Sequence, residues 1–250
     1  MSKILPAGII IFWLVMTALY VNKEILPQLP YLSEPSYELV IKHRAKLGTT
    51  QMGVYFINRR IGQSTSTITK KPNGYYEIAH HTKINLAQKI PGMDMPTLEI
   101  TGQTMINQIY LLDSFKFSIR MGETPYRVIG RVNGPDLILS INCLNSTQTH
   151  RVKFDPRATT SAGLSPFIAM PYLSVGKEWA IHMINPLTLK VETTMARVES
   201  QTTLEWQGQE HEVYEVIMDY KGFQPRAWIT PEGEILKEEG LMPGLYLIKE

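Results

Sequence analysis

The stretch Phe115-Lys116-Phe117-Ser118-Ile119-Arg120 alternates apolar and polar side chains at every second position. Successive side chains of a β-strand point to opposite faces, so this alternation turns an apolar face inward and a charged face outward. It predicts a half-buried β-strand and argues against a helix, in which apolar residues recur every three to four positions.

The same two-residue period recurs along the chain from Gly53 onward. Further alternating stretches are Leu137 to Cys143, Val152 to Phe154, Leu187 to Val198 and Tyr214 to Tyr220. Between the strands lie residues suited to hairpin turns: Pro72-Asn73-Gly74, Asn133-Gly134-Pro135-Asp136, Gln207-Gly208 and Pro231-Glu232-Gly233. About ten strands in roughly 200 residues predict an all-β domain, a curled antiparallel sheet that is either a half-barrel or a sandwich.

Residues 4–21 form an apolar run without a single charge. A helix of this length, at ~1.5 Å per residue, spans roughly the hydrocarbon core of a bilayer. We therefore expect residues 1–21 to be an uncleaved signal anchor that crosses the inner (cytoplasmic) membrane once, with the rest of the chain extracytoplasmic. The alternative is a cleaved signal peptide, because Met1-Ser2-Lys3 is a short basic start. Residues 16–21 offer no clean pair of small residues for the peptidase.

Residues 22–49 form the predicted connection between the membrane and the β domain, which covers residues 50–250. Prolines at 27, 30 and 35 favour an extended spacer. Residues 36–47 predict a short amphipathic helix, with Ser36 as its N-cap and Gly48 as its stop.

One irregular segment, residues 157–175, interrupts the alternation and combines prolines with large apolar residues. A long irregular segment in a compact domain is often a functional or covering loop. Its apolar residues, with two from the stretch that follows, either line a cavity for a lipid-like molecule or close the end of the sheet over its core. These candidate ligand-binding residues are Phe167, Met170, Tyr172, Trp179 and Met183.

Several short motifs occur in a familiar order: Leu164-Ser165-Pro166-Phe167, residues 173–179 (LSVGKEW), residues 227–237 (AWITPEGEILK) and Met242-Pro243-Gly244-Leu245. This order, with a hairpin at residues 55–62, resembles a β-rich module of bacterial envelope proteins. The module precedes a transglutaminase-like domain in certain proteins and is similar to periplasmic, lipoprotein-carrier-like open barrels of unknown function. The resemblance implies an extracytoplasmic curved sheet that holds an apolar ligand. It implies no transglutaminase activity, because the sequence ends at Glu250, where that catalytic domain would begin.

The sequence contains no recognisable catalytic or metal-binding arrangement. Cys143 shares a predicted strand face with Leu137 and Leu139, which favours a buried structural thiol. His80 and His81 are adjacent on a predicted strand and should point to opposite faces, so they cannot share a metal ion. The Glu238-Glu239 pair is expected at a solvated edge. We therefore expect no enzyme activity, no metal site and no cofactor.

Charge excludes one further class of partner. The 25 Lys and Arg residues nearly balance the 23 Asp and Glu residues, without a block of either sign, so nucleic-acid binding is not expected. The features together predict a membrane-anchored, non-catalytic binding protein that holds an apolar or lipid-like ligand or a partner protein. The alternative is an accessory or structural subunit of a membrane complex.

Overall fold

The computed structural model describes residues 12–17, 19–20, 35–43, 48–85, 97–143, 146–160, 167, 173–240 and 242–250. The chain divides into two compact units, residues 1–34 and residues 35–250. In the first unit, residues 12–17 and 19–20 are helical. Within the described part of the chain, no helix is both long enough and apolar enough to cross a membrane. Most of the predicted span, residues 4–21, lies outside the described residues, so it stays a prediction.

The described part of the second unit holds one short helix and fifteen strands. Helix α2 covers Tyr37–His43. The first eight strands are β1 (Gly48–Phe56), β2 (Arg59–Lys70), β3 (Tyr76–Ile84), β4 (Leu98–Ile106), β5 (Leu112–Met121), β6 (Thr124–Asn133), β7 (Asp136–Cys143) and β8 (Ser146–Lys153). The others are β9 (Thr159–Thr160), β10 (Glu178–Asn185), β11 (Lys190–Trp206), β12 (Gln209–Asp219), β13 (Arg226–Ile229), β14 (Ile235–Glu239) and β15 (Leu245–Lys249).

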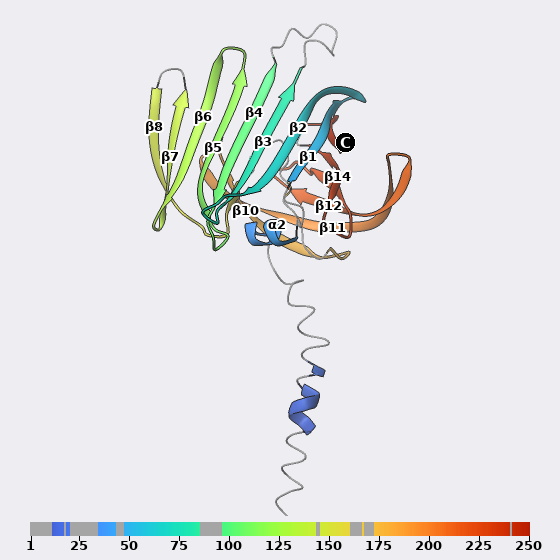
Figure 1. Ribbon diagram of the computed structural model, residues 1–250. Helices are drawn as coiled ribbons and strands as arrows, with labels where there is room; N and C mark the ends of the chain where they lie inside the picture. The colour runs from blue at the N-terminus through green and yellow to red at the C-terminus, as the bar shows by residue number, and fades with distance from the viewer. Residues whose placement is uncertain are drawn as a thin grey trace, which may run out of the picture. The chain divides into compact units, whose positions relative to one another are not determined.

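All fifteen strands belong to one sheet, in the order β8-β7-β6-β5-β4-β3-β2-β1-β15-β14-β13-β12-β11-β10-β9. Two meanders, β1 to β8 and β9 to β15, are joined because β1 pairs with β15. Neighbours are antiparallel except β9 and β10, which run parallel. The sheet curls but does not close, since β8 and β9 are separate edges (Figure 1). The all-β prediction is confirmed, in its half-barrel form.

The interior of the curled sheet holds two clusters of buried apolar side chains. The N-terminal core combines inward residues of β2 to β7 with helix α2. The C-terminal core combines inward residues of β10 to β15 with parts of β1 to β3. Strand β10 supplies both clusters, because Ile181 and Met183 belong to the C-terminal core and Ile184 to the N-terminal core. Strand β10 thus contributes buried side chains from both faces at its C-terminal end, although on the second face Glu178 is exposed and Ala180 and His182 are half-buried.

The β9–β10 end of the sheet packs against the concave side of β4 to β6. The hydroxyl of Tyr126 on β6 donates a hydrogen bond to the carbonyl oxygen of Pro186, at 3.0 Å. The hydroxyls of Thr104 on β4 and Thr160 on β9 lie 2.8 Å apart. These contacts join strands that are not neighbours in the sheet, so side-chain packing and hydrogen bonds hold the curl without a closing strand pair.

Helix α2 was predicted within residues 36–47, and its first part is confirmed. The carbonyl oxygen of Ser36 accepts the first helical hydrogen bond, from Val40 N at 3.1 Å. Tyr37 points into the N-terminal core, where its hydroxyl oxygen accepts a hydrogen bond from Thr160 N at 2.6 Å. Burial raises the pKa of Tyr37 to about 12, so the phenol stays protonated and also hydrogen-bonds the Thr160 hydroxyl. The helix is thereby fastened to strand β9.

The predicted turns are confirmed at the four places named from the sequence. Gly74, Gly134 and Gly233 adopt positive φ angles in the turns that follow β2, β6 and β13. Gln207 and Gly208 both have positive φ, as a two-residue type I′ hairpin requires.

The strand predicted to begin at Leu187 begins later, and this prediction is wrong. Pro186 to Leu189 form the turn between β10 and β11, with Leu189 at φ 60°. The side-chain oxygen of Asn185 accepts hydrogen bonds from the backbone N–H groups of Leu187 and Thr188. An asparagine that caps the backbone in this way favours a turn over a continuing strand.

The alternation predicted for residues 115–120 is confirmed on β5, where Phe115 and Phe117 are buried and Lys116 and Arg120 are exposed. On β7, the inward Leu137 and Leu139 are also buried. The prediction of a buried Cys143 is wrong, because this thiol is only half-buried. It is the last residue of β7 and pairs with the first residue of the edge strand β8, beyond the packed core.

A carboxylate stabilises the turn after β10. Glu192 on β11 accepts hydrogen bonds from the hydroxyls of Thr188 and Tyr220, the amide of Asn185 and the ammonium of Lys221, at 2.7 to 3.2 Å. Burial alone would raise its pKa, but these donors, Lys221 foremost, lower the pKa to about 2. The ionised form is therefore stabilised by folding.

Because the folded-state pKa of Glu192 is depressed, its contribution to stability is present above pH 4.5 and is lost as the pH falls toward 2. Glu192→Gln should lower the free energy of unfolding by about 2 kcal/mol at pH 7. The difference between wild type and variant should shrink between pH 4.5 and about 2. Urea titrations of both proteins at a series of pH values measure the difference in the free energy of unfolding. A difference that does not change with pH would refute the stabilising role of the ionised Glu192.

Candidate functional site

Three of the five predicted ligand-binding residues lie together in the C-terminal core. Phe167, Trp179 and Met183 are 7%, 4% and 4% exposed and belong to the same buried cluster. Met170 and Tyr172 lie outside the described residues. Phe167 comes from the irregular segment predicted as a covering loop, and its side chain is inserted into the core.

Strand β10 positions Trp179 and Met183 on the inward side. The alternation Trp179, Ile181, Met183 turns all three side chains to the C-terminal core. Trp179 pairs with Ala196 on β11, and Ala196 in turn pairs with Met218 on β12. The small alanine leaves room for the indole ring over the neighbouring strand.

A carboxylate also faces this interior. Glu238 on β14 pairs with Ala227 on one side and Leu247 on the other, and both partners are buried in the C-terminal core. Glu238 itself is 2% exposed, so its predicted place at a solvated edge is wrong. Its neighbour Glu239 lies on the other face, where Lys237 donates to it at 3.1 Å.

The indole of Trp179 adds a second polar group to the same interior. Its Nε1 is buried and has no hydrogen-bond partner within the described residues. A buried donor without a partner costs roughly 1 to 3 kcal/mol, so its position needs an explanation. Just before β10, the ammonium of Lys177 lies 5.2 Å from the centre of the Trp179 indole ring, and burial lowers the pKa of Lys177. Small-molecule sites likewise combine apolar surroundings with a few polar groups.

The other chemical expectations concern metals and nucleophiles. His80 and His81 lie on opposite faces of β3, as predicted: His81 is exposed and contacts Glu99 at 2.8 Å, whereas His80 is on the side of Thr82 and Ile84. Among the residues that the structure describes, no three His, Cys, Asp or Glu side chains are grouped closely enough to hold a metal ion.

This curled sheet has a solved counterpart. The chain is similar to the crystal structure of a beta-barrel-like protein of the domain of unknown function DUF1849 from Brucella abortus, with a TM-score of 0.50. The similarity covers 82% of this chain and 96% of that one at 9% sequence identity, so it concerns the fold alone. A DUF1089 family protein from Pseudomonas aeruginosa matches at a TM-score of 0.38 and 11% identity, over 72% of this chain and 90% of that one.

No protein-family model matches the sequence, and a search of curated proteins also found no match. The structural similarity is to a beta-barrel-like domain of unknown function, and it does not show the resemblance to modules that precede transglutaminase-like domains. The structure places the predicted residues Phe167, Trp179 and Met183 in one buried cluster, and it adds Glu238, which was expected at an edge from the sequence. Sequence parity does not reveal the position of Glu238, because the strand bulges at Leu236 and the interior face shifts from Ile235 to Glu238.

Proposed function

We propose that the chain is a non-catalytic binding protein of the bacterial inner membrane. Residues 4–21 anchor it, and the β domain lies outside the cytoplasm. The domain takes up an apolar or lipid-like ligand in the C-terminal core, at Phe167, Trp179 and Met183. The similarity of its sequence motifs to lipoprotein-carrier-like open barrels, including modules that precede transglutaminase-like domains, supports binding rather than catalysis.

The observation that carries this proposal is the pair of polar groups in the apolar interior. The Nε1 of Trp179 can donate a hydrogen bond to a carbonyl, ester or phosphate oxygen of a ligand. The carboxyl of Glu238 faces the same interior from β14. A ligand with an apolar body and a small polar head satisfies the indole donor, while the apolar surroundings contact its body. This chemistry describes a lipid-like amphiphile.

Replacing Trp179 with phenylalanine removes the donor and keeps an aromatic ring, which tests the proposal. The full chain is purified in a non-ionic detergent, and the lipid extracted from it is quantified by mass spectrometry. We expect about one bound lipid per wild-type chain and a three- to tenfold weaker retention in Trp179→Phe, the loss of one hydrogen bond.

Trp228→Phe is the matched control, because Trp228 is a half-buried tryptophan on the other face of β13, beside Lys237. This control should retain lipid like the wild type. Wild-type protein that is empty of lipid and co-purifies with a membrane protein in fixed stoichiometry would contradict the carrier role.

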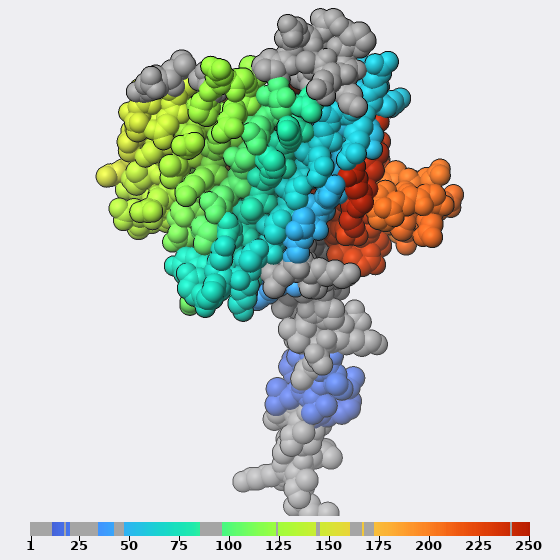
Figure 2. Space-filling view, turned by 45° about the horizontal axis from the view of Figure 1, so that its top comes forward, coloured from blue at the N-terminus to red at the C-terminus, as the bar shows by residue number. Residues whose placement is uncertain are grey.

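A second candidate function, an accessory subunit of a membrane complex, is favoured by the β11–β12 hairpin. Strand β11 is paired with β10 as far as Arg197, and β12 is paired with β13 from Tyr214 onward, so residues 199–213 pair only with each other, and the hairpin stands out from the sheet in Figure 2. Trp206 fastens the hairpin to β15 by a hydrogen bond from its Nε1 to the carbonyl oxygen of Lys249 at 2.7 Å. This segment carries four glutamates and neither lysine nor arginine. Such an acidic ribbon fits a basic surface on a partner.

The hairpin can be altered without disturbing the core. Glu205 and Glu210 face each other across it, and both are exposed. Replacing both with lysine should leave folding and lipid retention unchanged. If the subunit role is correct, the double variant loses its stoichiometric partner; if partner binding survives the charge reversal, the hairpin is not the contact.

A further inference from the structure

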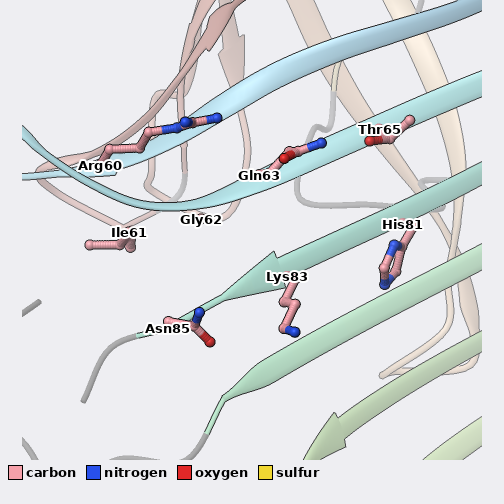
Figure 3. Close-up of a pocket in the computed structure, with 8 residues that line it drawn as sticks. All are labelled: Arg60, Ile61, Gly62, Gln63, Thr65, His81, Lys83 and Asn85. Atoms are coloured by element: carbon pink, nitrogen blue, oxygen red, sulfur yellow. The ribbon is translucent and has the colours of Figure 1, made fainter. Parts of the chain in front are cut away.

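The outer face of β2 and β3 carries a polar hollow that is separate from the interior site. Its volume is about 390 Å³. Figure 3 shows Arg60, Gln63 and Thr65 on β2 at one side, with His81, Lys83 and Asn85 on or just after β3 at the other. Small-molecule sites have volumes of roughly 300 to 1,000 Å³, so the hollow can admit more than a single inorganic ion.

A β-bulge in β2 shapes this hollow. Val54 of β1 pairs with Gly62, but the next residue, Tyr55, pairs with Arg60, so Ile61 is the extra residue. Ile61 turns inward and is 2% exposed. A bulge bends its strand and increases the local twist. The ladder between β2 and β3 ends at Gly62 and Ile84. The hollow thus lies where β2 bends and β3 ends.

The groups that line the hollow are mainly hydrogen-bond donors. Arg60 and Lys83 supply a guanidinium and an ammonium, and Gln63 supplies an amide. The side-chain oxygen of Asn85 accepts a hydrogen bond from the Thr97 hydroxyl at 2.8 Å. The amide nitrogen of Asn85 therefore remains to donate.

Nearby carboxylates compensate only part of the positive charge. Glu250 contacts Arg60, and Glu99 contacts His81 at 2.8 Å and Arg120 at 3.3 Å. Neither glutamate lines the hollow. Lys83 is exposed and lies opposite Glu99 of β4, whose pKa is lowered first by its hydrogen bond with His81 and further by the charges of Arg120 and Lys83. Because the direct contacts of Glu99 are with His81 and Arg120, the ammonium of Lys83 can still turn toward a ligand anion.

We propose that this hollow binds the phosphate group of a polyol phosphate. Lys83 and Arg60 contact the phosphate, because ammonium and guanidinium groups form strong charge-assisted hydrogen bonds with it. Gln63, Thr65 and Asn85 contact the hydroxyls of the polyol. The head group of an anionic phospholipid and a soluble sugar or glycerol phosphate share this chemistry.

Two probes distinguish these sources with the full chain in non-ionic detergent. Glycerol 1-phosphate represents the soluble source, and dihexanoyl phosphatidylglycerol represents the lipid head group. Dihexanoyl phosphatidylcholine, with a phosphate but no net charge or glycerol head, is the ligand control. Isothermal titration calorimetry should detect binding of at least one of the first two, weakened by added salt. Binding of only one assigns the source and supports the site.

Lys83→Gln should weaken the binding about tenfold without changing the unfolding midpoint, because Lys83 is exposed. Lys153→Gln makes an equal charge change at an exposed lysine on β8, and it should change the affinity for the probes by less than about twofold. The proposal is overturned if neither anionic probe binds at about 10 mM, if phosphatidylcholine binds equally, or if the two variants have the same effect. Trp179→Phe should not affect this binding, so the failure of one site is distinguishable from that of the other.

Discussion

Replacing Gly62 with alanine should lower the free energy of unfolding by about 3 kcal/mol or more. An alanine Cβ at this position would lie 2.1 Å from the backbone oxygen of Lys83 and 3.0 Å from the Cα of Ile84. Both atoms belong to the backbone of the paired strand, so the clash cannot be relieved by rotating a side chain. Relief requires β2 and β3 to separate beside the Asn85 N to Ile61 O hydrogen bond. Urea titration followed by tryptophan fluorescence measures the loss.

Gly240→Ala is the matched control for this prediction. The nearest atom to a Cβ at Gly240 is Leu245 Cδ2 at 3.4 Å, an ordinary contact, and Gly240 does not have a positive φ angle. We expect this variant to change the free energy of unfolding by less than about 0.5 kcal/mol. Equal losses in the two variants would mean that the close approach of β2 and β3 does not matter for stability.

Replacing either Ile181 or Ile184 with alanine should lower the free energy of unfolding by about 2 to 5 kcal/mol. Both side chains are 1% exposed, yet they lie on opposite faces of β10 and in different cores. Each substitution therefore leaves a cavity in a different cluster. Because β10 contributes side chains to both clusters, a cavity in one core should also lower the stability of the other core.

The measurement is urea unfolding of each variant, followed in parallel by fluorescence and circular dichroism. We expect the two signals to change together in both variants, since residues 35–250 form one compact unit. If Ile184→Ala unfolds in two steps while Ile181→Ala unfolds in one, the N-terminal core is independent and β10 does not couple the two clusters.

The sequence predicts strands wherever one face of the sheet is buried and the other is exposed to solvent. Phe115 and Phe117 alternate with exposed residues, and glycine or asparagine marks the turns between such strands. Period and turn chemistry are local properties, so they can be read from neighbouring residues. The Leu187 strand shows the weakness of the period alone: the alternation continues through the turn, whereas Pro186 and the capping side chain of Asn185 reverse the backbone.

The interior arrangement depends on long-range packing and could not be read locally. Strand β10 alternates like a strand with one solvent-exposed face, yet the curl of the sheet also buries Ile184 of its second face in the N-terminal core, with residues of β4 to β6. Glu238 is preceded by Lys237 and followed by Glu239, which indicates an exposed edge, whereas its pairing with Ala227 and Leu247 turns it inward. Which of three adjacent charged residues is buried depends on strand register.

The two proposed sites differ in chemistry because they lie on opposite faces of the same sheet. The interior site uses apolar contact with two polar groups, at Trp179 and Glu238. The outer hollow uses Arg60, Lys83 and amides at a bulge. A lipid-like amphiphile suits the first and a phosphate-bearing head group suits the second.

The most direct test of the interior site is photo-crosslinking of the full chain in cells that express it. Cells are grown with a diazirine-bearing fatty acid, irradiated, and the labelled peptides of the purified chain are identified by mass spectrometry. We expect label on β10 and β14, which carry Trp179 and Glu238, in addition to label on residues 4–21. Trp179→Phe should reduce the label on β10 and β14 but not on residues 4–21. Label confined to residues 4–21, with none on β10 or β14, would contradict a lipid-binding interior.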